Sequence, residues 1–241
     1  MPRIDVVAFD LDDTLVRLSS QFIPEYLKNL AQFLERTFPQ IPSVSSKILA
    51  SSRRMMAKTL DDERLEDFFF RDFCHETGLK REEVAQCLHA YYREQFPALR
   101  RYSQPMYGVM GLLATLRARG YRIALLTSAL FPIEAIDCRL EWAGLEDFPF
   151  DWRTSLEVVH ATKPQPGFYQ EAAQTSGIAP QRWLMVGNDL TEDIIPAYEA
   201  GMSVYWVCDD VKSDHSPQLP PLAAFGPLAR VVLWLEGNDG G

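Results

Sequence analysis

Apolar residues occur along the chain in two spacings, and these spacings predict an α/β core. Short runs rich in apolar and β-branched residues, typical of buried strands, lie at 4–9, 121–126, 155–159, 183–186 and 203–207. Segments with apolar residues every three to four positions, typical of helices packed on a core, lie at 106–118, 132–142, 167–176, 192–200 and 222–236. Because strands and helices alternate, we expect a doubly wound parallel sheet, a Rossmann-like α/β fold with helices on both faces.

One long stretch breaks this alternation, because it contains only helical patterns. The helices predicted in it cover 20–37, 43–59, 62–76 and 81–96. The first strand must nevertheless join the sheet that the later strands form. We therefore expect a core domain built from residues 1–16 and 101–241, with a smaller helical domain, 17–100, inserted into it. Residues 208–221, rich in aspartate and proline, are predicted to be a loop.

Composition narrows the class of protein. The chain has 241 residues, 47% of them hydrophobic, and a net charge of -9, which is the opposite of the basic balance of most nucleic-acid binders. No apolar run is long enough to cross a membrane, and the start of the chain resembles neither a signal peptide nor an anchor. The four scattered cysteines form no paired motif, which favours a reducing cytoplasm.

Polar side chains follow four of the predicted strands. In doubly wound folds, ligands bind beyond the carboxyl ends of the strands. The residues at these positions are Asp10, Asp12 and Thr14 after the first strand, Thr127 and Ser128 after the second, Lys163 after the third, and Asn188, Asp189 and Asp193 after the fourth. We therefore expect one rim of the sheet to carry the groups that a phosphate and a divalent cation require.

Each of these groups has a use in phosphate chemistry. Magnesium prefers hard oxygen ligands and keeps several waters, so a few carboxylates suffice. Asp10 can attack a phosphoryl group only if the charge on that group is neutralised, which a metal and Lys163 can do. Asp12 can protonate the leaving oxygen and then deprotonate a water. The hydroxyl groups of Thr127 or Ser128 can hold phosphate oxygens without adding charge.

The chain resembles the haloacid dehalogenase-like (HAD) superfamily in four motifs. The segment 10–14, Asp-Leu-Asp-Asp-Thr, matches the Asp-x-Asp-x-Thr signature of that family. Thr127, at the end of an apolar run, is similar to the second motif. The segment 163–169 resembles the third, a lysine before a helix, and 187–193 resembles the fourth, an acidic metal motif. The four occur in the family's order and, the insert excepted, cover residues 4–207, so together they are far more specific than any one alone.

The resemblance implies a role for each matching residue. Asp10 would be the nucleophile that becomes an aspartyl phosphate, and Asp12 would be the general acid and base, with its backbone carbonyl on Mg²⁺. Thr127 and Lys163 would bind the transferring phosphoryl group. The insert 17–100 stands where the family carries a cap domain, which closes over the site and selects the substrate, here a small phosphorylated metabolite.

Two sets of site residues follow from these motifs. The expected phosphate-binding set is Thr14, Thr127, Ser128 and Lys163. The expected metal-binding set is Asp10, Asp12, Asn188, Asp189 and Asp193. The fourth motif departs from the usual Gly-Asp, because Asn188 stands where that aspartate is expected and Asp189 follows it. The sequence does not choose between these two neighbours as the direct ligand.

Other functions remain open on the same residues. A 2-haloacid dehalogenase would use the same nucleophile without a metal, which the acidic fourth motif argues against. A phosphotransferase or phosphomutase would share the intermediate, and the sequence does not separate it from a hydrolase. A receiver module fits poorly because of the insert. A non-catalytic phosphate-binding protein would not need Asp10, Asp12, Thr127 and Lys163 together. Singly, each of these residues has an ordinary structural use, in turns, helix caps or on the surface.

Overall fold

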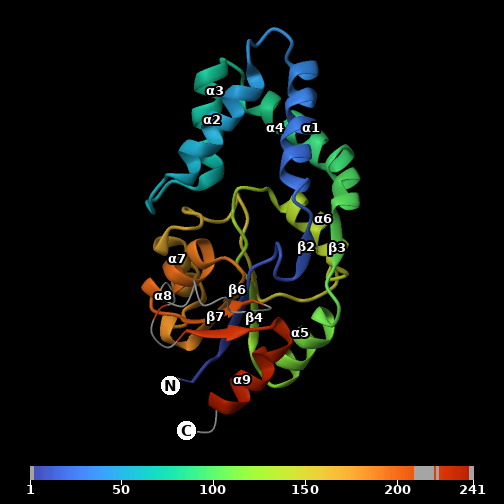
Figure 1. The fold of residues 1–241 in the computed structure, drawn as a ribbon. Coiled ribbons are helices and arrows are strands. Elements are labelled where there is room, and N and C mark those ends of the chain that lie inside the picture. The colour runs from blue at the N-terminus through green and yellow to red at the C-terminus, as the bar shows by residue number, and fades with distance from the viewer. Residues whose placement is uncertain (1–2, 209–219, 221–222, 239–241) are drawn as a thin grey trace.

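A parallel sheet forms the centre of the core in the computed structural model, which describes residues 3–208, 220 and 223–238 (Figure 1). Its six strands among these residues are ordered β5-β4-β1-β6-β7-β8. Their bounds are β1 (Val6–Phe9), β4 (Arg122–Leu125), β5 (Trp152–Arg153), β6 (Trp183–Gly187), β7 (Ser203–Val207) and β8 (Ala224–Gly226). The first strand lies between β4 and β6, in parallel register with both, and the expected doubly wound α/β fold is confirmed.

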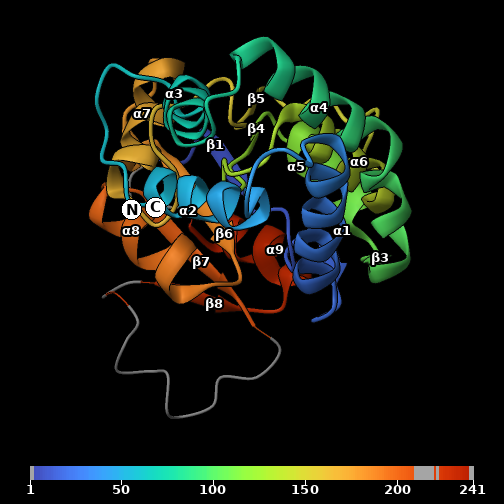
Figure 2. The ribbon, with the colours of Figure 1, turned by 90° about the horizontal axis from the view of Figure 1, so that it is seen from above.

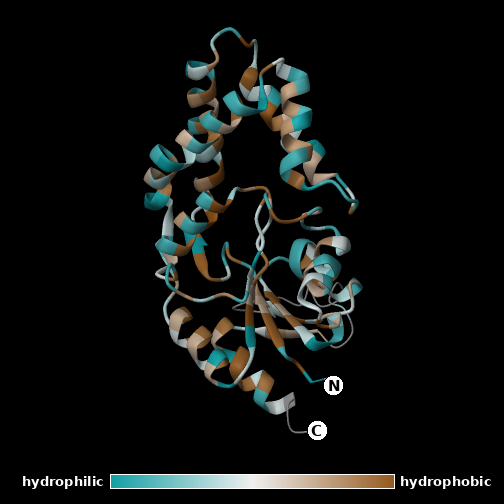
Figure 3. Ribbon diagram, turned by 180° about the vertical axis from the view of Figure 1, so that it is seen from behind, coloured by the Kyte–Doolittle hydropathy of each residue, from teal (hydrophilic) through white to brown (hydrophobic). Residues whose placement is uncertain are grey.

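Helices cover both faces of this sheet (Figure 1). On one side lie α5 (Val109–Ala118), α6 (Ile133–Ala143) and α9 (Val231–Asn238), and on the other lie α7 (Pro166–Ser176) and α8 (Ile195–Glu199). All four residues of β1 are buried, which explains its unbroken apolar sequence. Figure 3 shows the same pattern, with hydrophobic strands at the centre of the core.

The helical insert lies beyond the carboxyl ends of the strands (Figure 1). It consists of α1 (Phe22–Thr37), α2 (Val44–Met56), α3 (Leu65–Thr77), α4 (Arg81–Glu94) and the 3₁₀ helix η1 (Phe96–Tyr102). Figure 2, which looks down on the insert, shows these helices above the end of the sheet where β1, β4 and β6 stop. None of the helices that the structure describes is long and apolar enough to span a bilayer.

Aromatic side chains attach the base of the insert to the core. The rings of Phe96 and Trp142, on η1 and α6, are stacked with centroids 5.5 Å apart. The ring of Phe22, at the start of α1, meets Trp142 edge-on at 6.0 Å. The Tyr26 ring lies 5.2 Å from that of Phe131, in the loop before α6. These rings bury apolar area at the two points where the chain enters and leaves the insert.

Three predicted elements differ from those observed. The strand predicted over 155–159 is wrong, because β5 covers only Trp152–Arg153. The backbone carbonyls of Leu156 and Val159 accept hydrogen bonds from the insert instead of from a neighbouring strand. The helix predicted over 222–236 is divided into β8, a 3₁₀ turn at Leu228–Arg230 and α9. The helix predicted over 192–200 is also divided, into a π-helical turn and α8. The loop predicted over 208–221 lies outside the described residues, except at its ends.

A two-stranded antiparallel ribbon, β2 (Val16–Leu18) with β3 (Ser103–Pro105), was not predicted. It joins the chain segments that lead into and out of the insert. Each strand has only three residues, and β3 reads Ser-Gln-Pro, so neither carries the alternation that marks a strand. The pairing between distant segments forms them here.

Candidate active site

The turn after β1 places Asp10 at the centre of the sheet edge. The amide of Asp10 donates to the Val186 carbonyl of β6 at 2.9 Å, and the residue is only 7% exposed. The chain then reverses sharply, because the Leu11 carbonyl accepts from the Val16 amide at 3.0 Å. Asp13 makes the reversal possible with a φ of 58°, a left-handed conformation that aspartate tolerates better than most residues. The turn thus holds the Asp-x-Asp-x-Thr segment against the strand end.

A buried lysine connects the first loop to the fourth. The Nζ atom of Lys163 donates to Asp10 Oδ1 at 2.7 Å and to Asp193 Oδ1 at 2.6 Å, and the residue is 2% exposed. Burial lowers the pKa of Lys163, but the nearby carboxylates of Asp10 and Asp193 outweigh it and hold that pKa well above its usual value. One permanent cation therefore compensates part of the charge of two buried acids.

The fourth loop packs Asp193 against a glycine. Asp193 belongs to the π-helical turn η3 (Leu190–Ile194), and its Oδ2 accepts from the Asp189 amide at 3.1 Å. A Cβ atom added to Gly187 would lie far inside van der Waals contact of the Asp193 carboxyl group. The hydroxyl of Tyr169, on α7, donates to the Glu192 carbonyl at 2.6 Å and fixes the same turn from the other side. The close approach therefore requires glycine at the end of β6.

Asn188 and Asp189 face different partners. Asn188 Oδ1 accepts from the Thr14 hydroxyl at 3.1 Å, which places the amide against the first loop. Asp189 is exposed, and its Oδ1 accepts from the amides of Thr191 at 2.7 Å and Glu192 at 2.9 Å, so it caps η3. Burial would raise the pKa of Asp189, but these hydrogen bonds outweigh it and lower that pKa. Asn188 is thus the neighbour that lies beside the Asp-x-Asp-x-Thr turn.

Asp12 is held by an arginine that the sequence analysis did not single out. Arg139, on α6, forms an ion pair with Asp12 Oδ2 and has a relative exposure of 0%. Burial raises the pKa of Asp12 to about 6, although the Arg139 cation opposes that shift. Arg139 lies on the same buried face of α6 as Ile136 and Leu140. A charged residue at an apolar position of the helical pattern was therefore the available signal.

Hydroxyl groups connect the second and third loops. Thr127 follows β4, is 1% exposed, and accepts from the Thr154 hydroxyl at its carbonyl, 2.9 Å away. The Oγ of Ser128 lies 3.4 Å from the Oγ1 of Thr162, which also accepts from the Ala129 amide at 3.0 Å. Thr162, directly before Lys163, was not predicted. Its hydroxyl accepts a hydrogen bond from a distant part of the chain, and no local sequence pattern predicts that contact.

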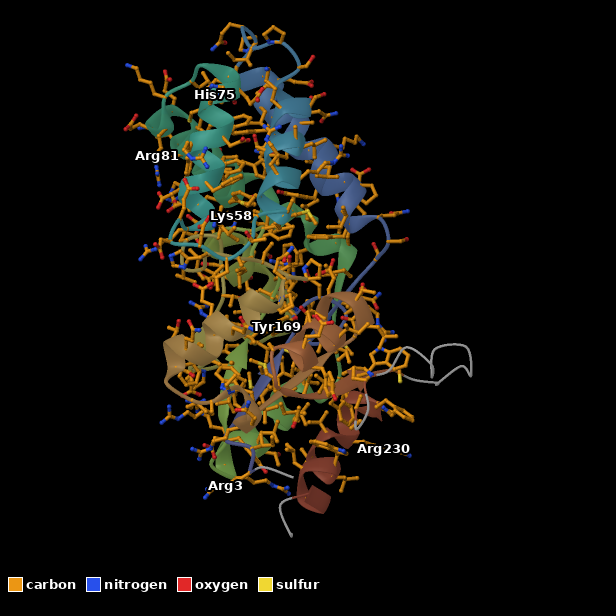
Figure 4. The ribbon with its side chains drawn as sticks, turned by 90° about the vertical axis from the view of Figure 1, so that its left-hand side faces the viewer. Arg3, Lys58, His75, Arg81, Tyr169 and Arg230 are labelled. Carbon is orange, nitrogen blue, oxygen red and sulfur yellow. The ribbon has the colours of Figure 1, made fainter. Side chains whose placement is uncertain are left out.

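The insert is bonded to the loop that precedes Lys163. The amides of Leu65 and Glu66, at the start of α3, donate to the carbonyls of Val159 and Leu156 at 2.9 and 3.1 Å. Lys58 Nζ donates to the His160 carbonyl at 3.0 Å, and Figure 4 shows Lys58 at the boundary between insert and core. These bonds explain why 155–159 is not a strand, since the insert uses the carbonyls of Leu156 and Val159.

A cavity of about 410 Å³ lies between insert and core. Helices α1 to α4 contribute apolar residues to it, among them Leu30, Ile48 and Phe69, and the core contributes Leu130 and Leu156. Its charged lining residues are Glu66, Glu134 and Glu157, with His89 beside them. The residues predicted to act on phosphate do not line it.

We predict that Gly187→Ala destabilises the protein by about 1–3 kcal/mol, because the new methyl group displaces Asp193 from its bonds. Gly111→Ala is the matched control. It lies within helix α5 with nothing within 4 Å of the added Cβ, and we expect a gain of about 0.5–1 kcal/mol. Urea unfolding of both variants measures the difference. Equal stability of Gly187→Ala and wild type would contradict the close packing described here.

Comparison with known sequences identifies the family. A sequence model described as haloacid dehalogenase-like hydrolase matches residues 4–201. The chain is 30% identical over 165 residues to the phosphoserine phosphatase of Thermus thermophilus, an alignment that covers 68% of this chain and 62% of that protein. It is 31% identical over 135 residues to the glyceraldehyde 3-phosphate phosphatase of Methanothermobacter thermautotrophicus, covering 55% and 57%. The alignments thus span less than two thirds of the length of these curated relatives.

A solved structure supports the same fold. The 2-haloacid dehalogenase of Pseudomonas syringae superposes with a TM-score of 0.62 over 98% of this chain and 100% of that one, at 20% identity. At that identity the likeness concerns the fold alone. The family match over 4–201, with its motifs on four neighbouring strand ends, shows that this chain belongs to the haloacid dehalogenase-like hydrolase family.

Proposed function

We propose that the protein is a magnesium-dependent phosphohydrolase that cleaves a small phosphomonoester through an aspartyl phosphate on Asp10. The observation that carries this proposal is the group formed by Asp10, Lys163 and Asp193 at the end of the central strands. A buried carboxylate with a cation 2.7 Å away can meet an anionic phosphoryl group that an isolated carboxylate would repel. The names of the two curated relatives, both phosphatases, support the same reaction class.

The reaction proceeds in two displacements. In the first, an oxygen of Asp10 attacks phosphorus and the bond to the leaving oxygen breaks, while Asp12 gives that oxygen a proton. In the second, a water attacks phosphorus, gives its proton to Asp12, and releases phosphate and free Asp10. Lys163 balances charge in both steps, and the hydroxyls of Thr127 and Ser128 hold the phosphate oxygens. The single hydroxyl proton of Thr14 goes to Asn188 Oδ1, so Thr14 orients that amide instead.

The residues present fit a magnesium ion that keeps much of its water. No three histidine, cysteine, aspartate or glutamate side chains of the described part of the chain form a metal-binding group on their own. Asp10, the carbonyl of Asp12 and the amide oxygen of Asn188 would supply hard ligands, with Asp193 acting through water. When bound, Mg²⁺ would neutralise charge on the phosphoryl group. Two buried carboxylates, Asp10 and Asp193, share the single Lys163 cation, and the negative charge that remains supports a cation at this place.

Asn188, rather than Asp189, is proposed as the direct ligand. Asn188 lies against Thr14 of the first loop, whereas the Asp189 carboxylate is occupied as a helix cap. Asparagine can supply a carbonyl oxygen but no charge, so it binds the cation more weakly than aspartate would.

We predict that Asn188→Asp lowers the Mg²⁺ concentration for half-maximal activity by on the order of tenfold, because a carboxylate adds charge at the ligand position. Asn188→Ala should raise it by a similar factor. Asp189→Asn is the control, since asparagine also caps helices. Magnesium titrations of phosphate release distinguish them. A larger effect at Asp189 than at Asn188 would reverse the assignment.

The variants Asp10→Asn and Asp13→Asn form a matched test of the proposed nucleophile. Asp10→Asn should abolish release of phosphate from p-nitrophenyl phosphate, because an amide cannot form the acyl phosphate. Asp13 stands in the same loop, is exposed, and tolerates asparagine in its left-handed conformation, so its variant should keep wild-type activity. Assays with Mg²⁺ and with EDTA test the metal at the same time. Activity in Asp10→Asn, or in EDTA, would contradict the proposal.

The insert is proposed to act as the cap domain, with residues 17–100 over a core of 1–16 and 101–241. The cavity between the two supports this role, since its volume suits a small metabolite and its walls come mainly from the insert. Among the described residues, its charged lining is glutamate without lysine or arginine, so a leaving group without negative charge suits it best. We place the enzyme in the cytoplasm, where such phosphorylated metabolites occur, and expect neither nucleic acid nor membrane as its partner.

We predict that Ala85→Trp, which narrows the cavity from α4, changes the order of preferred substrates in a panel of phosphorylated metabolites. Esters with the bulkiest leaving groups should lose at least about tenfold in kcat/KM relative to the smallest. Ala118→Trp, on the exposed end of α5, is the control and should leave the order unchanged. An unchanged order in Ala85→Trp would show that this cavity does not hold the leaving group.

A dehalogenase remains the alternative on this fold, because one solved neighbour has that activity in its name. It would release halide from a 2-haloacid without metal. Halide release by wild type, with no phosphate release from any ester, would replace the proposed function by this one.

A further inference from the structure

The ion pair between Arg139 and Asp12 has no part in the two displacements described above. Arg139 is fully buried on α6, within the apolar face that packs on the core. Burying a guanidinium group is costly unless charge and hydrogen bonds compensate it. The carboxylate of Asp12, 127 positions earlier in the chain, supplies the opposite charge. The position of this arginine therefore depends on Asp12, and that of Asp12 on the arginine.

The guanidinium group is fixed by partners other than Asp12. Its Nε donates to the Ala135 carbonyl, one turn earlier in α6, at 3.2 Å. Its Cζ lies 4.4 Å from the centre of the Phe131 ring, an arrangement that favours a cation. The Phe131 ring is in turn in contact with Tyr26 of the insert. A rigid helix and an aromatic ring thus set the direction in which Arg139 reaches Asp12.

The pair engages only one oxygen of Asp12. Oδ2 accepts from Arg139 Nη1, whereas Oδ1 has no hydrogen-bond partner among the described residues. A bidentate pair, the commoner form, would have occupied both oxygens. One-sided pairing directs Oδ2 toward the arginine and leaves two buried polar atoms, Asp12 Oδ1 and Arg139 Nη2, without a partner among the described residues.

We propose that Arg139 is a positioning residue, which holds the Asp12 carboxyl group so that its Oδ1 faces the leaving oxygen of the substrate. This inference rests on the proposed function. In the first displacement, the proton on Asp12 Oδ1 moves to the leaving oxygen as the phosphorus–oxygen bond breaks and the bond from Asp10 forms. The leaving group departs as a neutral alcohol, and Asp12 remains as a carboxylate beside the Arg139 cation. In the second displacement, the attacking water returns a proton to Asp12.

A pair of esters of nearly equal shape tests this role. p-Nitrophenolate is a good leaving group that needs little protonation, whereas phenolate is a poorer one that needs a proton more. Because kcat/KM reports only the steps up to the first irreversible bond cleavage, it isolates the donation of that proton from the second displacement. The quantity measured is the ratio of kcat/KM for phenyl phosphate to that for p-nitrophenyl phosphate.

In Arg139→Met, which keeps an apolar side chain of similar length, we expect this ratio to fall by about tenfold, less than the roughly 10²–10⁴-fold that a general acid itself contributes, because the variant misplaces Asp12 without removing it. Asp12→Asn defines how far the ratio falls when the acid is lost. In the double variant, Asp12→Asn with Arg139→Met, the ratio should fall no further than in Asp12→Asn alone. Arg139→Lys, which keeps the charge, should recover part of the ratio. Arg153→Met is the matched control, because Arg153 pairs with Asp137 on the exposed side of the same helix.

The ratio is independent of how much of a variant is folded, since both esters meet the same active molecules. A fall of the ratio in Asp12→Asn with an unchanged ratio in Arg139→Met would overturn the inference and leave the proposed function intact. An unchanged ratio in Asp12→Asn would overturn it as well, because Asp12 would then not be the acid. Wild type without turnover of either ester would refute the proposed function, and with it the role of Arg139.

Discussion

The buried ammonium group of Lys163 is the interaction on which the site depends. It lies between two carboxylates that come from different strands, Asp10 after β1 and Asp193 after β6. Removing one partner of a buried ion pair costs about 3–5 kcal/mol, because the remaining charge is left without compensation. The order of the strands, with β1 beside β6, is what brings these acids close enough to share one cation. Fold and site are therefore set by the same arrangement.

The same lysine makes the site sensitive to the insert. The loop that leads to Lys163 is bonded on one side to the second loop, through Thr162, and on the other to α3 and Lys58 of the insert. On the opposite side, Tyr26 of the insert reaches the Phe131 ring on which Arg139 lies. Both cationic residues of the site are thus supported by contacts that the insert makes with the core. A movement of the insert would therefore shift Lys163 and Arg139, and with them the side chains of Asp10 and Asp12.

The sequence predicts the core well where physical constraints are local. Strands buried on both faces are apolar, so the runs at 4–9 and 183–186 predicted β1 and β6, and the polar residues after them predicted the candidate site. The contacts between distant segments could not be predicted in this way. The run at 155–159 is rich in apolar residues like a strand, but its Leu156 and Val159 carbonyls accept hydrogen bonds from the insert. Arg139 was visible only as a charge at an apolar helical position, and its partner lies 127 positions away. The close approach of Gly187 to Asp193 likewise needed the folded chain.

Asp10 is proposed as the nucleophile whose carboxylate oxygen bonds to phosphorus. A complex with a phosphoryl analogue tests this role most directly. Beryllium fluoride binds covalently to carboxylates that accept phosphoryl groups, so a crystal structure with Mg²⁺ and beryllium fluoride would show the acceptor. The account predicts density continuous with an Asp10 carboxylate oxygen, with the Lys163 ammonium beside a fluoride. Density on another carboxylate, or none under conditions in which the protein hydrolyses phosphate esters, would contradict it.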